Sequence, residues 1–326
     1  MKKQWILGLI LFISPSLWAL SNLEQAFVKK MVKEHGFKKA YIEKYLKKAV
    51  YKQNIINAIT RPAEKTKEWF EYRPIFITQR RAKQGYQFWR KNKKTFDKAE
   101  QQFGIPAEII AAIIGVETRY GRFTGGYRVL DALSTIGFHY KKRGAFFQSE
   151  LAQFFILCRE EGLDPTVPTG SYAGAMGMPQ FISSSFRNLA HDFDKDGKKD
   201  IWNNNQDVIG SVANYFHHHH WHPGEAVAIP LKIKKLTSKI SQTGRKTKKP
   251  DVRLKELKVL GIKTPTELMD IELATIIKLE QKKHSDYWLG LHNFYVITRY
   301  NHSNLYAMAV FQLSQKIRKL MDNDQV

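Results

Sequence analysis

The stretch IPAEIIAAIIGVETRYG, residues 105–121, predicts a buried helix in the middle of the chain. Pro106 suits the first helical turn, and isoleucines then recur at the spacing of one helix face as far as Ile113. Glu117 follows Ile113 by four residues, so it continues the buried face rather than the solvent-exposed one. A carboxylate there either pairs with a cation, marks a small error in the assumed register, or has its ionisation suppressed by burial.

The composition and the first residues indicate an exported globular protein. The chain has 326 residues, 43% of them hydrophobic, which is enough for one large domain or a few smaller ones. Residues 1–21 combine two lysines, an apolar run and small residues, which predicts a signal peptide cleaved near Ala19 or Ser21. That segment has no cysteine for a lipid anchor, and no later run is long and apolar enough to span a bilayer. We therefore expect a soluble periplasmic protein without a membrane anchor.

The cysteine content limits the disulfide and thiol chemistry that is available, and the net charge indicates the kind of partner. Cys158 is the only cysteine, which excludes an intramolecular disulfide, and its helical setting favours a small core residue over a nucleophile. Lys and Arg outnumber Asp and Glu by 53 to 30, so the partner should be a polyanion. For an exported protein, the carboxylate-bearing peptides of the cell wall fit this charge better than nucleic acid does.

The pattern along the chain predicts four segments after the signal peptide. Residues 22–75 form a basic helical region, and residues 76–225 alternate helices with glycine-rich loops. Residues 226–287 contain two strand-like runs, AVAIPLKIK and IELATIIKLEQ, on either side of a Lys-rich stretch that we interpret as a solvated loop. Residues 288–326 begin with a strand-like or extended run, LHNFYVITRYN, and end in a helix. The predicted fold class is mainly α (α+β), with a small inserted antiparallel β subdomain.

Glu117 is the candidate general acid. Desolvation on an apolar face and the negative end of the helix dipole should both raise its pKa. A carboxylic acid kept protonated near neutrality is what a glycosidase needs to protonate a leaving oxygen. The alternative is a buried glutamate paired with Arg119 or Arg122, and helical periodicity alone favours that alternative.

A glycine-rich stretch, GSYAGAMGMPQFISSSF at residues 170–186, is a candidate sugar-binding segment. Its glycines would let the backbone approach another group closely. Ser171, Tyr172 and Gln180 supply a hydroxyl, an aromatic ring and an amide, which suit an N-acetylated sugar. The alternative is tight helix packing through small residues.

An acidic segment at residues 192–207 is similar to an EF-hand loop. Three aspartates fall at positions 1, 3 and 5, with glycine at position 6. Position 12 is Asn203 rather than a bidentate glutamate, so a later aspartate would have to close a longer loop. We expect a structural Ca²⁺ or Na⁺ in this loop and no cofactor for the chemistry; the alternative is an acidic surface turn. The candidate metal ligands are Asp192, Asp194, Asp196, Lys198 and Asp207.

Together these segments resemble the lytic murein transglycosylase B family, the glycoside hydrolase 103 type. Its motifs GVETRYG, SYAGAMGMPQF, DFDKDGKKDIWNNNQDVIGSVANYF, PGEAV and ITRYNHSNLYAMAV follow in order, from about residue 60 to about residue 318. The resemblance implies a lysozyme-like helical core with a small β domain. It also implies cleavage of the MurNAc–GlcNAc β-1,4 bond without water, which leaves a 1,6-anhydro-muramoyl end, and a cation held in the acidic loop.

The resemblance also implies the site residues. GVET places the family's single catalytic acid/base on Glu117, and KKRGAFF makes Arg143 an expected partner of the acidic peptide stems. The candidate substrate-binding residues are Ser171, Gln180, Tyr72, Arg143, Tyr172, Tyr215, Tyr300, Asn301 and Tyr306.

A lone carboxylate fits poorly with hydrolysis by two flanking carboxylates. Glu117 would instead protonate the glycosidic oxygen, and the substrate's acetamido group would steady the positive charge. Glu117 would then deprotonate the C6 hydroxyl as it attacks C1. The alternatives are a lysozyme-type hydrolase with a second carboxylate such as Asp131, and a non-catalytic wall-binding protein. We expect a monomer whose partners are peptidoglycan glycan strands and cell-wall synthesis proteins.

Overall fold

The computed structural model describes residues 20–60, 67–233, 242–244, 246–259, 261–263, 269 and 272–324. The chain forms two compact units, a small one that ends at Ala49 and a large one that begins at Val50. The predicted N-terminal region, 22–75, therefore spans both units, and the other predicted boundaries stay predictions. Most of the predicted signal peptide, up to residue 19, lies outside the described residues. Within the described residues, no helix combines the length and the apolar composition that crossing a membrane requires.

The small unit is a pair of packed helices, α1 (Asn22–His35) and α2 (Lys39–Lys48). Ser21 and Glu24 form a capping box that starts α1, and Gly36 ends it in the left-handed conformation, φ 67°. The apolar faces of both helices are buried, as the amphipathic spacing predicts. Their buried side chains are Phe27, Val28, Met31, Ile42, Tyr45 and Leu46.

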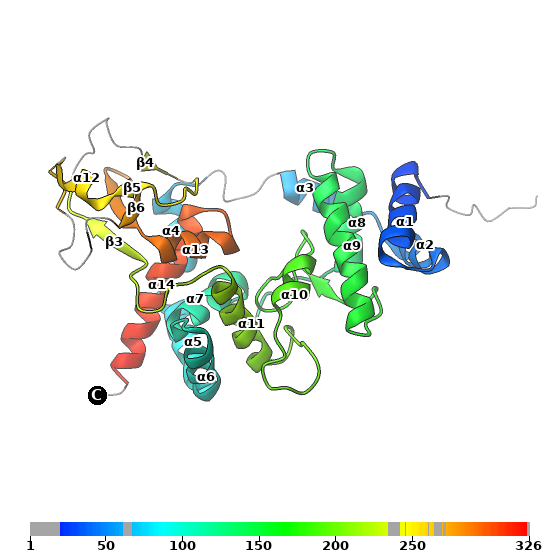
Figure 1. Cartoon of the computed structure of the whole chain (residues 1–326), viewed down its shortest axis with the longest axis horizontal. Coiled ribbons are helices and arrows are strands. Elements are labelled where there is room, and N and C mark those ends of the chain that lie inside the picture. The colour runs from blue at the N-terminus through cyan, green and yellow to red at the C-terminus, as the bar shows by residue number, and fades with distance from the viewer. Residues whose placement is uncertain are drawn as a thin grey trace, which may run out of the picture. The chain divides into compact units, whose positions relative to one another are not determined.

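The large unit is mostly helical (Figure 1). Its helices are α3 (Gln53–Thr60), α4 (Trp69–Phe76), α5 (Gln79–Lys91), α6 (Lys93–Phe103), α7 (Ala107–Thr118), α8 (Val129–His139), α9 (Gly144–Glu160), α10 (Ser183–Leu189), α11 (Asn205–His218), α12 (Leu254–Val259), α13 (His292–Tyr300) and α14 (Asn304–Asp322).

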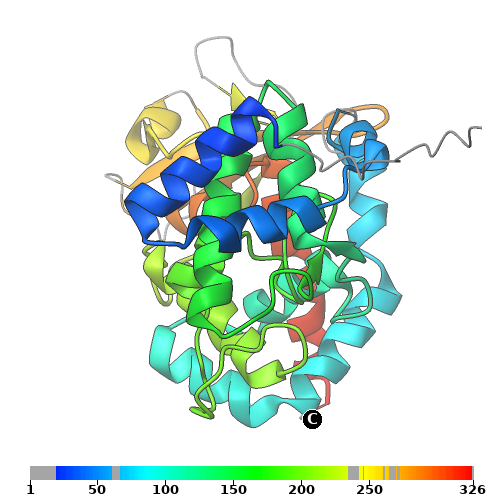
Figure 2. The same ribbon diagram turned by 90° about the vertical axis from the view of Figure 1, so that its right-hand side faces the viewer.

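Helix α7 confirms the helix predicted from the isoleucine spacing. It packs against α14, α5, α11 and α6, so nearly every side is covered and Ile110, Ile113 and Ile114 are fully buried. A second group of helices forms around the antiparallel pair α8 and α9, with α10 packed on α9 (Figure 2). Helix α7 thus brings Glu117 to a position between the C-terminal helices and the loops that follow α9.

The sheet of the large unit confirms the predicted β region. Its strands are β3 (Ala228–Leu231), β4 (Gln242–Thr243), β5 (Val252–Arg253), β6 (Leu273–Glu280) and β7 (Ser285–Gly290). The order is β3-β7-β6-β4, with β5 also paired to β6. All of these pairs are antiparallel as predicted, except that the short β4 runs parallel to β6. A separate two-stranded ladder joins β1 (Tyr127–Arg128) to β2 (Thr169–Gly170).

The prediction of a strand-like or extended run at residues 291–301 was wrong, because this segment is helix α13. Its β-branched and aromatic residues favour strands, but their burial follows a helical face that packs on α14. Asn293, fully buried, also fixes the helix start: its amide donates to the carbonyls of His222 and Glu225 at 2.8 and 3.0 Å. Tertiary packing therefore overrides the local strand preference.

Candidate active site

Glu117 lies in the last turn of α7, where the chain leaves the helix through two residues with positive φ, Arg119 and Tyr120. The neighbouring Thr118 fixes this end. Its hydroxyl donates to the Met178 carbonyl at 3.0 Å and accepts from the Gly121 amide at 3.1 Å. The end of α7 is therefore tied to the glycine-rich segment. Thr118 is not among the residues predicted from the sequence. A threonine at a buried position of the GVET motif does indicate a hydroxyl that bonds inside the protein.

Tyr306, in the first turn of α14, holds the carboxylate of Glu117. Its hydroxyl donates to Oε1 of Glu117 at 2.5 Å, and its side chain is 2% exposed. Burial, followed by the charge of Glu117, raises the pKa of Tyr306 well above its usual value, so the phenol stays a proton donor. Ser303 caps α14 by accepting from the Tyr306 amide, which sets the position of this tyrosine.

Three of the predicted substrate residues, Tyr215, Tyr300 and Tyr306, come together from helices α11, α13 and α14. The rings of Tyr300 and Tyr306 are nearly parallel, with centroids 6.5 Å apart, and the Tyr215 centroid lies 4.6 Å from that of Tyr300. The Tyr300 hydroxyl donates to the Pro179 carbonyl at 2.5 Å, and the Tyr215 hydroxyl donates to the Arg299 carbonyl at 2.7 Å. These hydroxyls bind the protein itself, so substrate contacts through the rings stay a prediction.

The glycine-rich segment also lies at this site. Gln180, with φ 52°, donates through Nε2 to the carbonyls of Thr124 and Gly177 at 3.0 and 2.8 Å. Ser171 accepts the Ala175 amide at 3.1 Å. Both side chains, and Tyr172 beside them, are half-buried. Gln180 and Ser171 therefore stabilise the loop whose Met178 carbonyl accepts from Thr118, and their sugar contacts stay predictions.

The glycines of this segment serve internal packing. A Cβ atom at Gly170 would lie 2.1 Å from the Ala175 carbonyl oxygen, and one at Gly177 would lie 2.4 Å from the Ile201 carbonyl oxygen. The close approach that the sequence predicted is thus made by the protein's own backbone, and this favours the packing alternative for these glycines.

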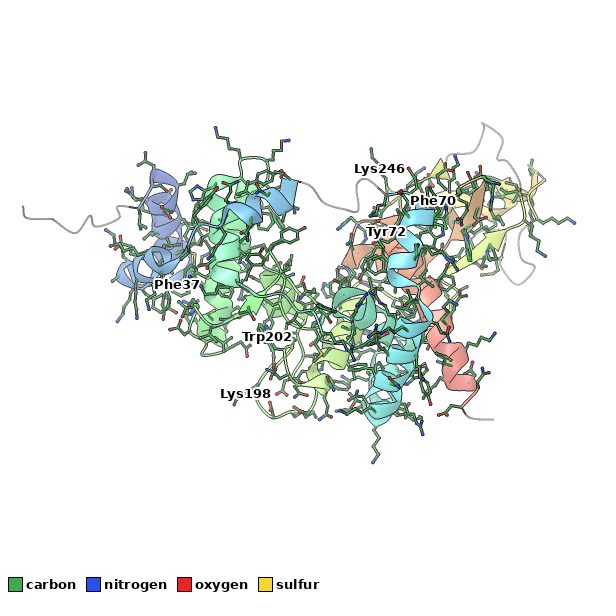
Figure 3. All side chains as sticks on the ribbon, turned by 180° about the vertical axis from the view of Figure 1, so that it is seen from behind. Phe37, Phe70, Tyr72, Lys198, Trp202 and Lys246 are labelled. Atoms are coloured by element: carbon green, nitrogen blue, oxygen red, sulfur yellow. The ribbon has the colours of Figure 1, made fainter. Side chains whose placement is uncertain are left out.

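The remaining predicted substrate residues differ in how far they are exposed to solvent. Tyr72 on α4 is only 2% exposed and packs its ring against Phe76, so little of it is accessible (Figure 3). Asn301 directly follows α13, is half-buried, and accepts the Ser303 amide through its carbonyl at 2.7 Å. Arg143 is exposed at the start of α9, where its guanidinium lies over the ring of Phe146.

Asp131, the candidate second carboxylate of a hydrolase, is committed elsewhere. It is 3% exposed and accepts from the Arg128 guanidinium at 2.7 and 2.9 Å. Its Oδ1 also accepts the Val50 amide at 2.9 Å. A carboxylate whose oxygens are held by an arginine and a backbone amide is poorly suited to activating water. This geometry disfavours the hydrolase alternative.

The acidic loop brings three carboxylates together. Oxygens of Asp192, Asp194 and Asp196 lie within 4.8 Å of one another. Asp192 shapes the turn by accepting the backbone amides of Asp196 and Gly197 at 3.1 and 2.9 Å. The clustered hard oxygen ligands and the sharp glycine turn fit a calcium ion.

The geometry does not support the prediction that Asp207 is a direct ligand. Asp207 is fully buried, and its two oxygens accept the amides of Phe193 and Asp200, both at 2.8 Å. It therefore ties the two ends of the loop to α11 and lies outside the three-carboxylate group. Burial raises the pKa of Asp207, while these two hydrogen bonds act in the opposite direction. Lys198 is exposed, and its amide donates to Asp196 at 2.9 Å.

Comparison with known sequences gives a family and a relative. The family model described as transglycosylase SLT domain matches residues 20–315. The membrane-bound lytic murein transglycosylase B of Escherichia coli K12 is 39% identical over 302 residues, which cover 90% of this chain and 82% of that protein.

Solved structures give the same result. The catenated lytic transglycosylase SltB1 of Pseudomonas aeruginosa superposes with a TM-score of 0.87 at 46% identity, covering 92% of this chain and 98% of that one. The Escherichia coli lytic transglycosylase Slt35, solved in complex with calcium, has a TM-score of 0.84 at 37% identity, covering 92% and 94%. On the sequence match and the shared fold together, this chain belongs to the lytic murein transglycosylase B family of SLT-domain transglycosylases.

Proposed function

We propose that this protein is a peptidoglycan lytic transglycosylase. It cleaves the MurNAc–GlcNAc β-1,4 bond without water and leaves 1,6-anhydro-MurNAc ends. The observation that carries this proposal is one carboxylate, Glu117, held by Tyr306 among stacked aromatic rings, while Asp131 is committed to an ion pair. The family membership supports the same activity.

Glu117 acts as acid and then as base. Because Tyr306 donates to Oε1, the proton that Glu117 delivers to the glycosidic oxygen is expected on Oε2. The substrate's acetamido group stabilises the positive charge at C1. The ionised Glu117 keeps the hydrogen bond from Tyr306 and removes the proton of the C6 hydroxyl as that oxygen attacks C1.

The acidic loop holds a structural cation, for which Ca²⁺ fits the donor set better than Na⁺. Its ligands are the carboxylates of Asp192, Asp194 and Asp196, with the carbonyl of Lys198 at position 7 of the loop. The relative Slt35, solved with calcium, supports this assignment. The ion stabilises the loop and takes no part in the proton transfers.

The protein acts in the periplasm as a soluble monomer on glycan strands. Without Lys2 and Lys3 of the predicted signal peptide, the net charge is +21 (51 basic against 30 acidic residues), which suits a wall polymer whose peptide stems carry carboxylates. Partners among cell-wall synthesis proteins, a contact of Arg143 with peptide stems, and sugar contacts of the aromatic residues belong to this proposal as well.

Digestion of purified murein followed by mass analysis tests the function. Products lighter by one water than those of a lysozyme are expected, because the C6 hydroxyl captures C1. Hydrated reducing ends would assign the hydrolase alternative instead. Binding without any cleavage would assign the wall-binding alternative.

A further inference from the structure

The chain leaves helix α7 through two consecutive residues with a left-handed backbone, Arg119 at φ 50° and Tyr120 at φ 60°. Residues other than glycine are uncommon in this region, and they persist there only where the surrounding structure holds them. The Arg119 amide donates to the carbonyl of Gly115 at 3.2 Å. The Tyr120 amide donates to that of Ile114 at 3.3 Å, and the two bonds close the last turn of the helix. Glu117 lies in this turn, so a group that holds Tyr120 also holds the backbone of Glu117.

The side chain of Tyr120 fills a notch between helices α5 and α7, which pack side by side (Figure 1). Two glycines form this notch, Gly85 on α5 and Gly115 on α7, and a Cβ atom at either one would overlap the hydroxyl oxygen of Tyr120. At Gly85 the side chain of Ile317 would be met as well. At Gly115 the three nearest atoms outside the backbone of the helix all belong to Tyr120, with the ring carbon Cζ at 2.6 Å. A larger residue at position 115 would therefore displace the phenol.

One face of α5 holds the rest of Tyr120. The hydroxyl donates to the Arg81 carbonyl at 3.2 Å, and the ring centroid lies 5.5 Å from that of Phe88. Arg81, Gly85 and Phe88 follow one another at the spacing of one helix face, so the hydrogen bond, the notch and the second ring line up along the phenol. Burial raises the pKa of Tyr120, although the charge of Arg81 acts in the opposite direction, so the phenol stays a donor.

We propose that Tyr120 is a positioning residue for Glu117. Its phenol fills the notch and thereby fixes the left-handed end of α7 and the turn in which Glu117 lies. The carboxylate is then held where Tyr306 donates to its Oε1. The inference rests on the proposed function, because it names a residue that acts in that reaction through Glu117.

Variants on both sides of the notch test this role in the full mature protein, with soluble glycan strands as substrate. Tyr120→Leu removes the tip of the ring and keeps an apolar side chain. Gly115→Ala keeps Tyr120 and inserts the Cβ atom that its ring excludes. Tyr120→Phe removes only the hydrogen bond to the Arg81 carbonyl. Phe154→Leu is the matched control, because Phe154 is a fully buried aromatic residue of α9, a helix other than α5, α7 and α14.

We expect kcat to fall at least about tenfold in Tyr120→Leu and in Gly115→Ala, with KM changed less than about twofold. A misplaced catalytic group lowers the rate of the chemical step without weakening binding. Tyr120→Phe keeps the ring in the notch and should keep at least about half of kcat. Phe154→Leu should lower the melting temperature and leave kcat unchanged, with all rates measured well below the melting temperature of each protein.

Combining the two changes gives a sharper test. Gly115→Ala together with Tyr120→Leu should lose no more activity than Tyr120→Leu alone, because both changes act on one contact. Losses that multiply in the double variant would overturn the proposal. Unchanged kcat in folded Tyr120→Leu and Gly115→Ala proteins would overturn it as well.

Failure of the proposed function would be seen separately, as the absence of anhydro products from the unmutated protein. Amide hydrogen exchange then tests the end of α7 without turnover. The amide of Arg119 should exchange at least about tenfold faster in Tyr120→Leu, while the amide of Ile113 in the middle of α7 keeps its rate. Equal exchange of the Arg119 amide in the two proteins would show that Tyr120 does not hold this turn and would overturn the proposal.

Discussion

At the scale of single residues, the proposed chemistry depends on the Glu117 carboxylate and on the Tyr306 phenol that donates to it. Glu117→Gln keeps the volume of the side chain but cannot donate or remove the proton. Turnover of murein should therefore fall at least ~10²-fold, the usual scale of general acid–base catalysis. Sedimentation with murein sacculi should show that binding survives. Activity close to that of the unmutated protein would mean that the carboxylate is structural.

Tyr306→Phe removes the donor to Oε1 of Glu117 and keeps the ring. A hydrogen bond to an ionised group contributes more than a neutral one, so kcat should fall about tenfold. Losing a donor to the carboxylate favours its protonated form, so the alkaline limb of the kcat/KM profile should move to higher pH. Tyr300→Phe is the control, because that hydroxyl donates to the Pro179 carbonyl. If the two variants have the same pH profile of kcat/KM, the hydroxyl of Tyr306 has no role in the reaction and the residue contributes only packing.

His219, at the end of α11, should make stability depend on pH. Burial, with help from nearby positive groups, lowers its pKa to about 4, below the unfolded value of about 6.5. The unfolded chain then binds more protons between these two pH values, so stability is complete above about pH 6.5 and is lost as the pH falls toward 4. Urea unfolding at several pH values should show a smaller loss in His219→Gln. The same loss in both proteins would assign it to other groups.

At the scale of elements, the acidic loop is where the sequence and the structure give different roles to one residue. The sequence predicts Asp207 as a metal ligand, whereas the structure shows it bound to two backbone amides. The three clustered aspartates repel one another unless a cation binds, so an ion that binds only the folded state should stabilise it. The loop lacks the bidentate glutamate, so its dissociation constant for calcium should be ~10⁻⁴–10⁻³ M. The melting temperature should rise with millimolar calcium and lose that rise in Asp192→Ala combined with Asp196→Ala.

The Asp207→Asn variant tests whether Asp207 only holds the loop together or also binds the cation. An amide can accept only one of the two backbone amides that Asp207 accepts, so this variant should melt lower with or without calcium. If Asp207 only braces the loop, the calcium-dependent rise survives. If the variant melts lower and its melting temperature no longer rises with calcium, Asp207 is a ligand of the ion. No calcium-dependent shift in the unmutated protein would mean that the loop is an acidic turn.

At the scale of the whole molecule, local patterns predicted the elements better than the contacts between them. The isoleucine spacing predicted α7, and the long motifs predicted the family. The hydrogen bond from Tyr306 to Glu117 joins residues 189 positions apart, which no local pattern encodes. Helix α13 was misread for the same reason, since its burial depends on α14 rather than on its own strand-forming residues. The brace made by Asp207 likewise depends on amides that only the folded loop brings together.

The net charge of the whole chain leads to the last prediction. Without Lys2 and Lys3 of the predicted signal peptide, 51 basic and 30 acidic residues leave a net charge of +21. This charge attracts a polyanionic wall over distances that salt screens, with a Debye length of about 10 Å at 0.1 M and about 3 Å at 1 M. Binding of Glu117→Gln protein to sacculi should therefore weaken steeply as sodium chloride rises through this range, while short uncharged glycans bind equally at all salt concentrations. Because the charge lies largely on exposed lysines, the loss should appear in the association rate. Salt-independent binding to sacculi would mean that contacts in the site hold the wall without the surrounding charge.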